Sequence, residues 1–154
     1  MSARFTDPEE REFLSTMHTA IVTTNRRDGW PISLPVWFAL VDDAVYFRTP
    51  ARSKKVARVR NDGRACLLVE SGEAWIDLRA VLWLGRLVEV TDDALRERAG
   101  GVISEKYSAF RTSRSKLPDA TAKHYGSSDV MYELRPEERR LSWDNRKLRL
   151  AGTQ

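Results

Sequence analysis

The fold is decided by the stretch TAIVTTNRRDGWPISLPVWFALVDDAVYFRT, residues 19–49. It contains three segments rich in β-branched and aromatic residues, which favour β-strands: residues 19–24, 32–41 and 44–49. Only short turns separate these segments, with Asp28-Gly29 in the first turn and Asp42-Asp43 in the second. Parallel strands need a crossover of a dozen or more residues, so turns this short predict antiparallel strands.

The same kind of pattern continues along the rest of the chain. Further strands are predicted at residues 64–70, 75–90, 130–135 and 140–143, and helices at residues 53–60, 93–107 and after a cap at Thr6. Pro35 implies a sheet edge or a bulge, and Gly85 implies a bend in a long strand. Residues 108–128 are predicted to be a polar, basic loop. Six or seven short strands with few helices predict a small antiparallel barrel.

Length and composition limit the class of protein. The 154 residues predict one domain, 1–154, with a basic tail from about residue 145. There is no run of eighteen apolar residues and no apolar signal region near the N-terminus, so a cytoplasmic location without membrane contact is expected. A net charge of +4 suits an anionic ligand. The single cysteine excludes an internal disulfide, and two histidines without nearby Cys or carboxylate ligands predict no metal site.

A second stretch, Arg48-Thr-Pro-Ala-Arg-Ser-Lys-Lys55, carries the chemistry. A predicted strand ends at Thr49 and Ser53 opens a predicted helix, so Lys54 and Lys55 fall in its first turn. A helix N-terminus is partly positive, which disfavours cations there by roughly 0.3–1 kcal/mol. A bound anion removes this conflict, because backbone N–H groups, two hydroxyls and a lysine ammonium can surround a phosphate. The alternative interpretation is a solvated basic helix.

Five motifs, taken in order, resemble the pyridoxamine 5′-phosphate oxidase-like split-barrel family. They are WPISLPVWF (30–38), VYFRT (45–49), SKK (53–55), LRAV (78–81) with Gly85 after it, and SWDNRKL (142–148). The resemblance spans about residues 6–148. It implies a mainly β fold, namely a six-stranded antiparallel split β-barrel of the FMN-binding type. It also implies a homodimer with two cofactors at the interface, each either FMN or the deazaflavin coenzyme F420.

The resemblance further implies which residues bind the cofactor. Together with the basic stretch, it gives a predicted set of ten residues: Pro35, Val36, Trp37, Phe38, Arg48, Thr49, Ser53, Lys54, Lys55 and Arg79. The first four would line the ring, and Thr49, Ser53 and Lys55 would hold the phosphate. The chain departs from the family pattern at three positions, where Arg58 replaces a common Asn, Ala80 a Gly, and Asn145 a His.

The predicted function is that of a flavin- or deazaflavin-dependent oxidoreductase acting on a small organic molecule. The cofactor would carry the hydride chemistry, and the protein would supply binding and orientation. A protein that binds or sequesters the cofactor without turnover is the alternative. Nucleic acid is not an expected partner, because the basic residues do not alternate with aromatic residues along one surface. Arg111, Arg114 and Lys116 are interpreted either as a solvated loop or as a lid that attracts an acidic cofactor tail.

Overall fold

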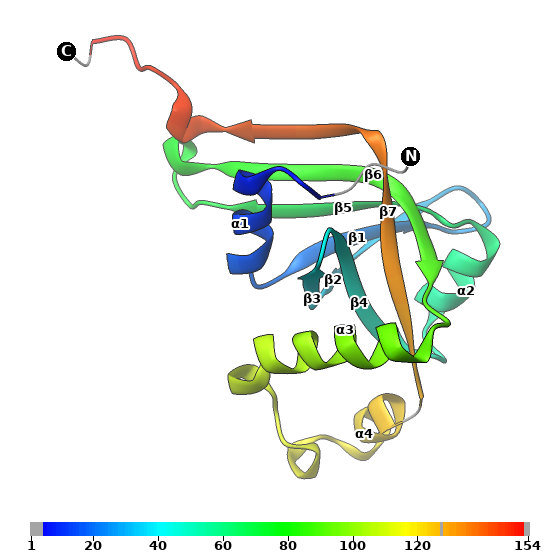
Figure 1. Cartoon of the computed structure of the whole chain (residues 1–154). Helices are drawn as coiled ribbons and strands as arrows, with labels where there is room; N and C mark the ends of the chain where they lie inside the picture. The colour runs from blue at the N-terminus through cyan, green and yellow to red at the C-terminus, as the bar shows by residue number, and fades with distance from the viewer. Residues whose placement is uncertain (1–4, 127, 153–154) are drawn as a thin grey trace.

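The computed structural model describes residues 5–126 and 128–152, without the side chains of residues 138 and 139, and Figure 1 shows its fold. With η marking a 3₁₀ turn, the elements in chain order are α1 (Pro8–Thr16), β1 (Ala20–Asn25), β2 (Pro31–Val36), β3 (Phe38–Val41), β4 (Ala44–Pro50), α2 (Lys54–Asn61), β5 (Arg64–Ser71), η1 (Trp75–Asp77), β6 (Arg79–Glu89), α3 (Asp93–Lys106), η2 (Ser108–Phe110), η3 (Arg114–Lys116), α4 (Asp119–Gly126), β7 (Asp129–Asp144) and η4 (Asn145–Lys147).

The seven strands form one antiparallel sheet in the order β2-β1-β5-β6-β7-β4-β3. Its two edge strands, β2 and β3, are consecutive in the chain, with only Trp37 between them. A sheet whose two edges are joined by a single residue has to curl, and this one forms a half-barrel (Figure 1). Counted as one kinked strand, β2 and β3 make six strands in all. The antiparallel, mainly β fold predicted from the sequence is therefore confirmed.

Two hydrophobic clusters lie on opposite sides of the sheet. Alternate strand residues such as Leu67 and Trp83 point into the barrel and pack with Phe13 of α1. On the other side, Tyr46 of β4 packs against Ile103 of α3. Consequently α3 covers the outer surface of β3 and β4, whereas α1 and α2 close the two ends of the barrel (Figure 1).

Several predicted elements have different limits in the structure. The predicted strand at 32–41 breaks at Trp37, and the one at 75–90 begins only at Arg79, after η1. The two short strands predicted at 130–135 and 140–143 are a single strand, β7, because it follows β6 along almost its whole length. The predicted loop at 108–128 contains η2, η3 and α4.

Local hydrogen bonding explains two further details. Asp7, not Thr6, caps α1, because its carboxylate accepts from the backbone N–H of Glu10 at 3.0 Å. The bend predicted at Gly85 is confirmed as an irregularity in the pairing of β6 with β7. A Cβ atom at this position would collide with the carbonyl oxygen of Arg135, so only glycine fits. Among the described residues, no helix has the length and apolar character needed to cross a membrane.

Candidate cofactor site

The predicted phosphate site lies where β4 ends and α2 begins. The hydroxyl oxygens of Thr49 and Ser53 lie 3.2 Å apart. Ser53 is the N-cap residue of α2, but its hydroxyl makes no capping hydrogen bond. The first N–H groups of the helix are thus left without a side-chain acceptor, and such groups are natural ligands for an anion.

Lys55 supplies a buried cation to the same site. Only 8% of its surface is exposed. Its ammonium lies 5.6 Å from the centre of the Phe47 ring, and within the described part of the chain it has no hydrogen-bond or ion-pair partner. Burial, and next the charge of Arg58, lower the pKa of Lys55 below its usual value. A buried cation without a counter-ion is costly, so this site fits an anion such as phosphate.

The other two basic residues that this stretch contributes to the predicted set point elsewhere. Lys54 is exposed on the surface of α2. Arg48 lies on the opposite face of β4 from Thr49, where its guanidinium donates to the Ser104 hydroxyl at 3.2 Å and lies 3.8 Å from the carboxylate of Asp129. The structure therefore brings together Thr49, Ser53 and Lys55, and it places Arg48 between the sheet and α3.

The four residues predicted to line the cofactor ring surround the break between β2 and β3. Pro35 is exposed on the edge strand, as its lack of an N–H donor led us to expect, and Val36 and Phe38 are buried. Trp37 is half-buried and stacks on Tyr107, with ring centres 4.5 Å apart and ring planes 3° from parallel. The two stacked rings form a rigid aromatic surface beside the strand break.

Tyr107 holds the strand break in place. Its hydroxyl accepts from the N–H of Phe38 at 2.9 Å and lies 2.7 Å and 2.8 Å from the carbonyl oxygens of Phe38 and His18. Lys106 also donates to the Phe38 carbonyl, at 3.1 Å, and burial lowers the pKa of this lysine to about 8. The sequence analysis missed both residues, because nothing in the sequence indicates that the end of α3 meets the strand break.

Replacing Tyr107 with phenylalanine is expected to destabilise the protein by about 1–3 kcal/mol, because the buried N–H of Phe38 loses its acceptor. Chemical denaturation followed by tryptophan fluorescence measures this loss. Tyr125→Phe is the matched control, since Tyr125 is exposed on α4. Equal midpoints for the two variants would show that the Tyr107 hydroxyl does not hold the strand break.

Arg79 lies far from this site within one chain. It begins β6 at the end of the sheet near α1 and η4, whereas α2 lies at the other end (Figure 1). Its guanidinium packs 4.0 Å from the centre of the Phe13 ring and lies 3.7 Å from a carboxylate oxygen of Glu9 and 3.8 Å from one of Asp144. One chain alone therefore does not place Arg79 beside Lys55.

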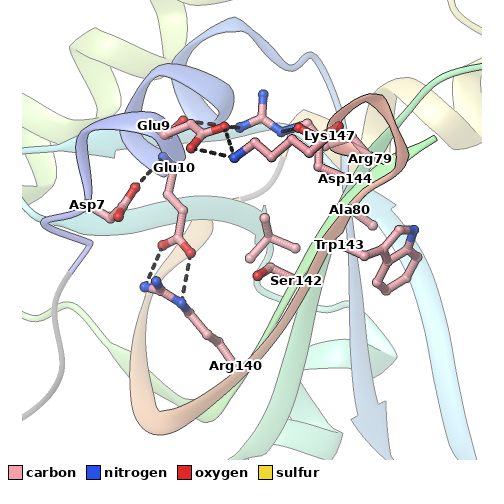
Figure 2. A pocket seen from close by; sticks show the side chains of 11 residues that line it. Asp7, Glu9, Glu10, Arg79, Ala80, Arg140, Ser142, Trp143, Asp144 and Lys147 are labelled. Atoms are coloured by element: carbon pink, nitrogen blue, oxygen red, sulfur yellow. Dashed lines mark hydrogen bonds and ion pairs between the residues drawn. The ribbon is translucent and has the colours of Figure 1, made fainter. Parts of the chain in front are cut away.

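Arg79 lines a charged pocket of about 270 Å³. Figure 2 shows that carboxylates of α1 face basic side chains of β7 and η4 across it. Arg140 binds Glu10 through two bonds of 2.9 and 3.0 Å, and Lys147 lies 2.8 Å from Glu9. The acidic and basic groups of this pocket are thus largely paired with one another.

Asn145 anchors the C-terminal segment beside this pocket. Its side-chain amide donates to the carbonyl of Trp75 at 2.6 Å, and its backbone N–H donates to that of Leu78 at 2.9 Å. These bonds attach η4 to the chain just before β6. The asparagine at this position therefore has a structural partner.

The outer face of the sheet carries a continuous apolar row. The cross-strand register places five residues side by side on β2, β1, β5, β6 and β7: Pro35, Ile21, Leu68, Leu82 and Leu141. Leu141 is 62% exposed, and its neighbours Leu84 and Trp143 are also exposed. A contiguous apolar surface of this kind marks an interaction face.

Comparison with known proteins identifies the family of this chain. Residues 6–142 match the family model described as pyridoxamine 5′-phosphate oxidase. The chain belongs to this family. The resemblance seen in the sequence is thereby confirmed.

Several solved structures share this fold. A conserved hypothetical protein of Mycobacterium tuberculosis is 27% identical, with a TM-score of 0.78 over 97% of this chain and 91% of that one. A FAD-binding protein of Mesorhizobium loti (18% identity, TM-score 0.65, 92% and 96% covered) and a heme-binding protein of Mycobacterium smegmatis (16%, 0.65, 89% and 57%) share the fold. Thus structural neighbours of this family member bind more than one kind of cofactor. Among curated proteins, none matches the chain.

Proposed function

We propose that this protein is a flavin- or deazaflavin-dependent oxidoreductase that binds the phosphate of its cofactor at the start of α2. The buried and unpaired ammonium of Lys55 carries this proposal. Thr49 and Ser53 add hydroxyls that can donate, and the helix adds N–H groups, so several hydrogen-bond donors surround the ammonium. Hydrogen-bond donors that surround a buried cation are typical of a phosphate-binding site.

The strand break is the proposed place for the cofactor ring. The exposed edge of β2 at Pro35 and the stacked rings of Trp37 and Tyr107 form a fixed surface close to the barrel edge. When bound, a flavin or deazaflavin supplies hydride or electron transfer. The chain itself binds the phosphate, orients the ring and keeps the strand break rigid through the Tyr107 hydroxyl.

A homodimer is proposed because a second copy of the chain would cover the exposed apolar row. A two-fold axis brings the same patch of both protomers together, so an apolar row can cover its own copy. α2, which carries Lys55, and the start of β6, which is Arg79, lie at opposite ends of the sheet (Figure 1). In a two-fold dimer whose protomers lie antiparallel, α2 of one protomer would lie beside the start of β6 of the other. A cofactor bound at that junction would contact both protomers.

Two alternatives stay open within this proposal. FMN and the deazaflavin coenzyme share the phosphate that the site is proposed to bind, and they differ in the acidic tail of the deazaflavin. The basic segment with Arg111, Arg114 and Lys116 is exposed and suits such a tail. A protein that binds the cofactor without turnover has the same site, so only a reaction distinguishes it from an enzyme.

The test has a binding step and a turnover step. FMN and the deazaflavin coenzyme are titrated separately into cofactor-free protein, and the quenching of tryptophan fluorescence is measured. The bound cofactor is then reduced, and its reoxidation by small organic acceptors is followed by absorbance. Saturable binding of at least one cofactor with repeated reoxidation is expected. Binding without any reoxidation would favour the sequestering protein, and failure to bind either cofactor would contradict the proposal.

A further inference from the structure

A second cation lies beside Lys55 on α2. Arg58 is three residues further along, so both side chains lie on the same face of the helix. The Nε–H of Arg58 donates to the hydroxyl of Thr24 at 2.9 Å, which fixes the plane of the guanidinium. Its Nη2 atom is buried and has no hydrogen-bond partner. An arginine with a buried, unused N–H group is rare, because such a group is costly to desolvate.

Neither cation has a counter-ion in the described part of the chain. Nearby arginines do, since Arg60 lies 3.7 Å from a carboxylate oxygen of Glu89 and Arg64 lies 2.8 Å from one of Asp62. The charge of Arg58 contributes to the lowered pKa of Lys55, and burial lowers the pKa of Arg58 itself. Lys55 is buried and Arg58 is partly buried, so the two charges repel each other, and an anion bound between them would offset this repulsion.

Threonine hydroxyls flank Lys55 and Arg58. Thr24 and Thr49 are 1% and 6% exposed, so the groups that flank the two cations are themselves almost fully buried. Thr24 is occupied as the acceptor of Arg58, whereas Thr49 faces Ser53. A guanidinium oriented in this way presents a flat pair of N–H donors, the geometry that matches two oxygens of one phosphate.

We infer that Arg58 is a second phosphate-binding cation, which uses its free Nη2 donor to contact the phosphate of the bound flavin or deazaflavin. This inference rests on the proposed function. It assigns a specific role to a residue outside the set of ten predicted from the sequence. It also assigns Thr24 as the positioning residue that holds the Arg58 guanidinium in its binding orientation.

The test compares two arginines of the same helix. Arg58→Gln and Arg60→Gln remove the same charge from α2, but Arg60 is exposed and points away from the site. FMN and riboflavin, which lacks the phosphate, are titrated into each full-length variant. Arg58→Gln is expected to weaken FMN binding at least about tenfold and to leave riboflavin binding unchanged. Arg60→Gln is expected to leave both unchanged. If FMN does not bind, the deazaflavin coenzyme and its phosphate-free core replace the two ligands.

Two further variants separate charge from orientation and guard against misfolding. Arg58→Lys keeps the charge but loses the flat pair of donors, and Thr24→Val removes the orienting hydroxyl while keeping the side-chain shape. Both are expected to weaken FMN binding by less than Arg58→Gln, with riboflavin again unaffected. Circular dichroism and thermal unfolding confirm that each variant is folded.

The outcomes distinguish this inference from the function on which it rests. Equal FMN affinity in wild type and Arg58→Gln, with weakened affinity in a Lys55 variant, would overturn the role of Arg58 and leave the phosphate site standing. Equal losses for FMN and riboflavin would also overturn it, because the phosphate would then not be the group recognised. Failure of wild type to bind either cofactor would contradict the proposed function, and the role of Arg58 with it.

Discussion

Lys55→Met is expected to weaken binding of the phosphorylated cofactor by about 1.5–3 kcal/mol, the range for a lost hydrogen bond to a charged group. The same change is expected to stabilise the cofactor-free protein by about 1 kcal/mol or more. Lys55 is a buried cation without a partner, and a methionine of similar length fills its space without the cost of burying a charge. Fluorescence titration measures the first effect, and thermal unfolding of the cofactor-free protein measures the second.

The matched control for this prediction is Lys54→Met, which removes the same charge one residue earlier from an exposed position. It should change neither quantity by more than about 0.5 kcal/mol. A destabilised cofactor-free Lys55→Met protein with unchanged cofactor affinity would show that Lys55 is a structural residue.

The pH dependence of stability gives an independent check on Lys55. Its pKa is lowered in the folded state, so it releases its proton at a lower pH there than in the unfolded chain. The unfolded state then binds more protons, and the wild type gains stability relative to Lys55→Met as pH rises from the lowered pKa toward about 10.4. Cofactor binding should change in the opposite direction, because the neutral amine attracts phosphate less.

Leu82→Glu is expected to be a monomer, whereas the wild type is proposed to be a dimer. Leu82 lies in β6 between Leu68 and Leu141, inside the apolar row of the outer face. Because a two-fold dimer buries the same residue in both protomers, it would desolvate two new carboxylates. Dimerisation should therefore weaken at least about a hundredfold. Sedimentation at micromolar concentration measures the change. The cofactor affinity should fall with it, since the proposed site lies at the junction of two protomers.

The control for this prediction is Val102→Glu, which places the same charge on an exposed apolar residue of α3, away from the sheet face. This variant should remain a dimer. A wild-type protein that sediments as a monomer would exclude the proposed interface and the junction site. A Leu82→Glu protein that remains a dimer would place the interface on another face.

The fold could be predicted from the sequence because its signals are local. Short turns between residues 19 and 49 determine antiparallel pairing, and Pro35 and Gly85 mark an edge and a bulge by their own backbone chemistry. The break at Trp37 could not be predicted, because it depends on Tyr107, which lies 70 residues further along the chain. The strand limits in β7 likewise depend on pairing with β6, which is not a local property.

Part of the candidate site could likewise be predicted from local sequence, and part of it could not. The strand-to-helix junction with Thr49, Ser53 and Lys55 could be predicted from residue types at close spacing, because the short turn between β4 and α2 brings them together. Arg48 lies in the same stretch, yet strand alternation turns it to the opposite face, toward Ser104. The burial of Lys55 and the unused donor of Arg58 arise only when α2 packs against the end of the barrel, so the sequence could not reveal them.

The most direct test of the phosphate site is the affinity difference that the phosphate alone makes in the wild-type protein. FMN is compared with riboflavin, and the deazaflavin coenzyme with its phosphate-free core, by isothermal titration at one pH and salt concentration. For whichever cofactor binds, we predict that the phosphorylated form binds at least about tenfold more tightly. Equal affinities for the phosphorylated and phosphate-free forms, or no binding of any of the four, would contradict the account.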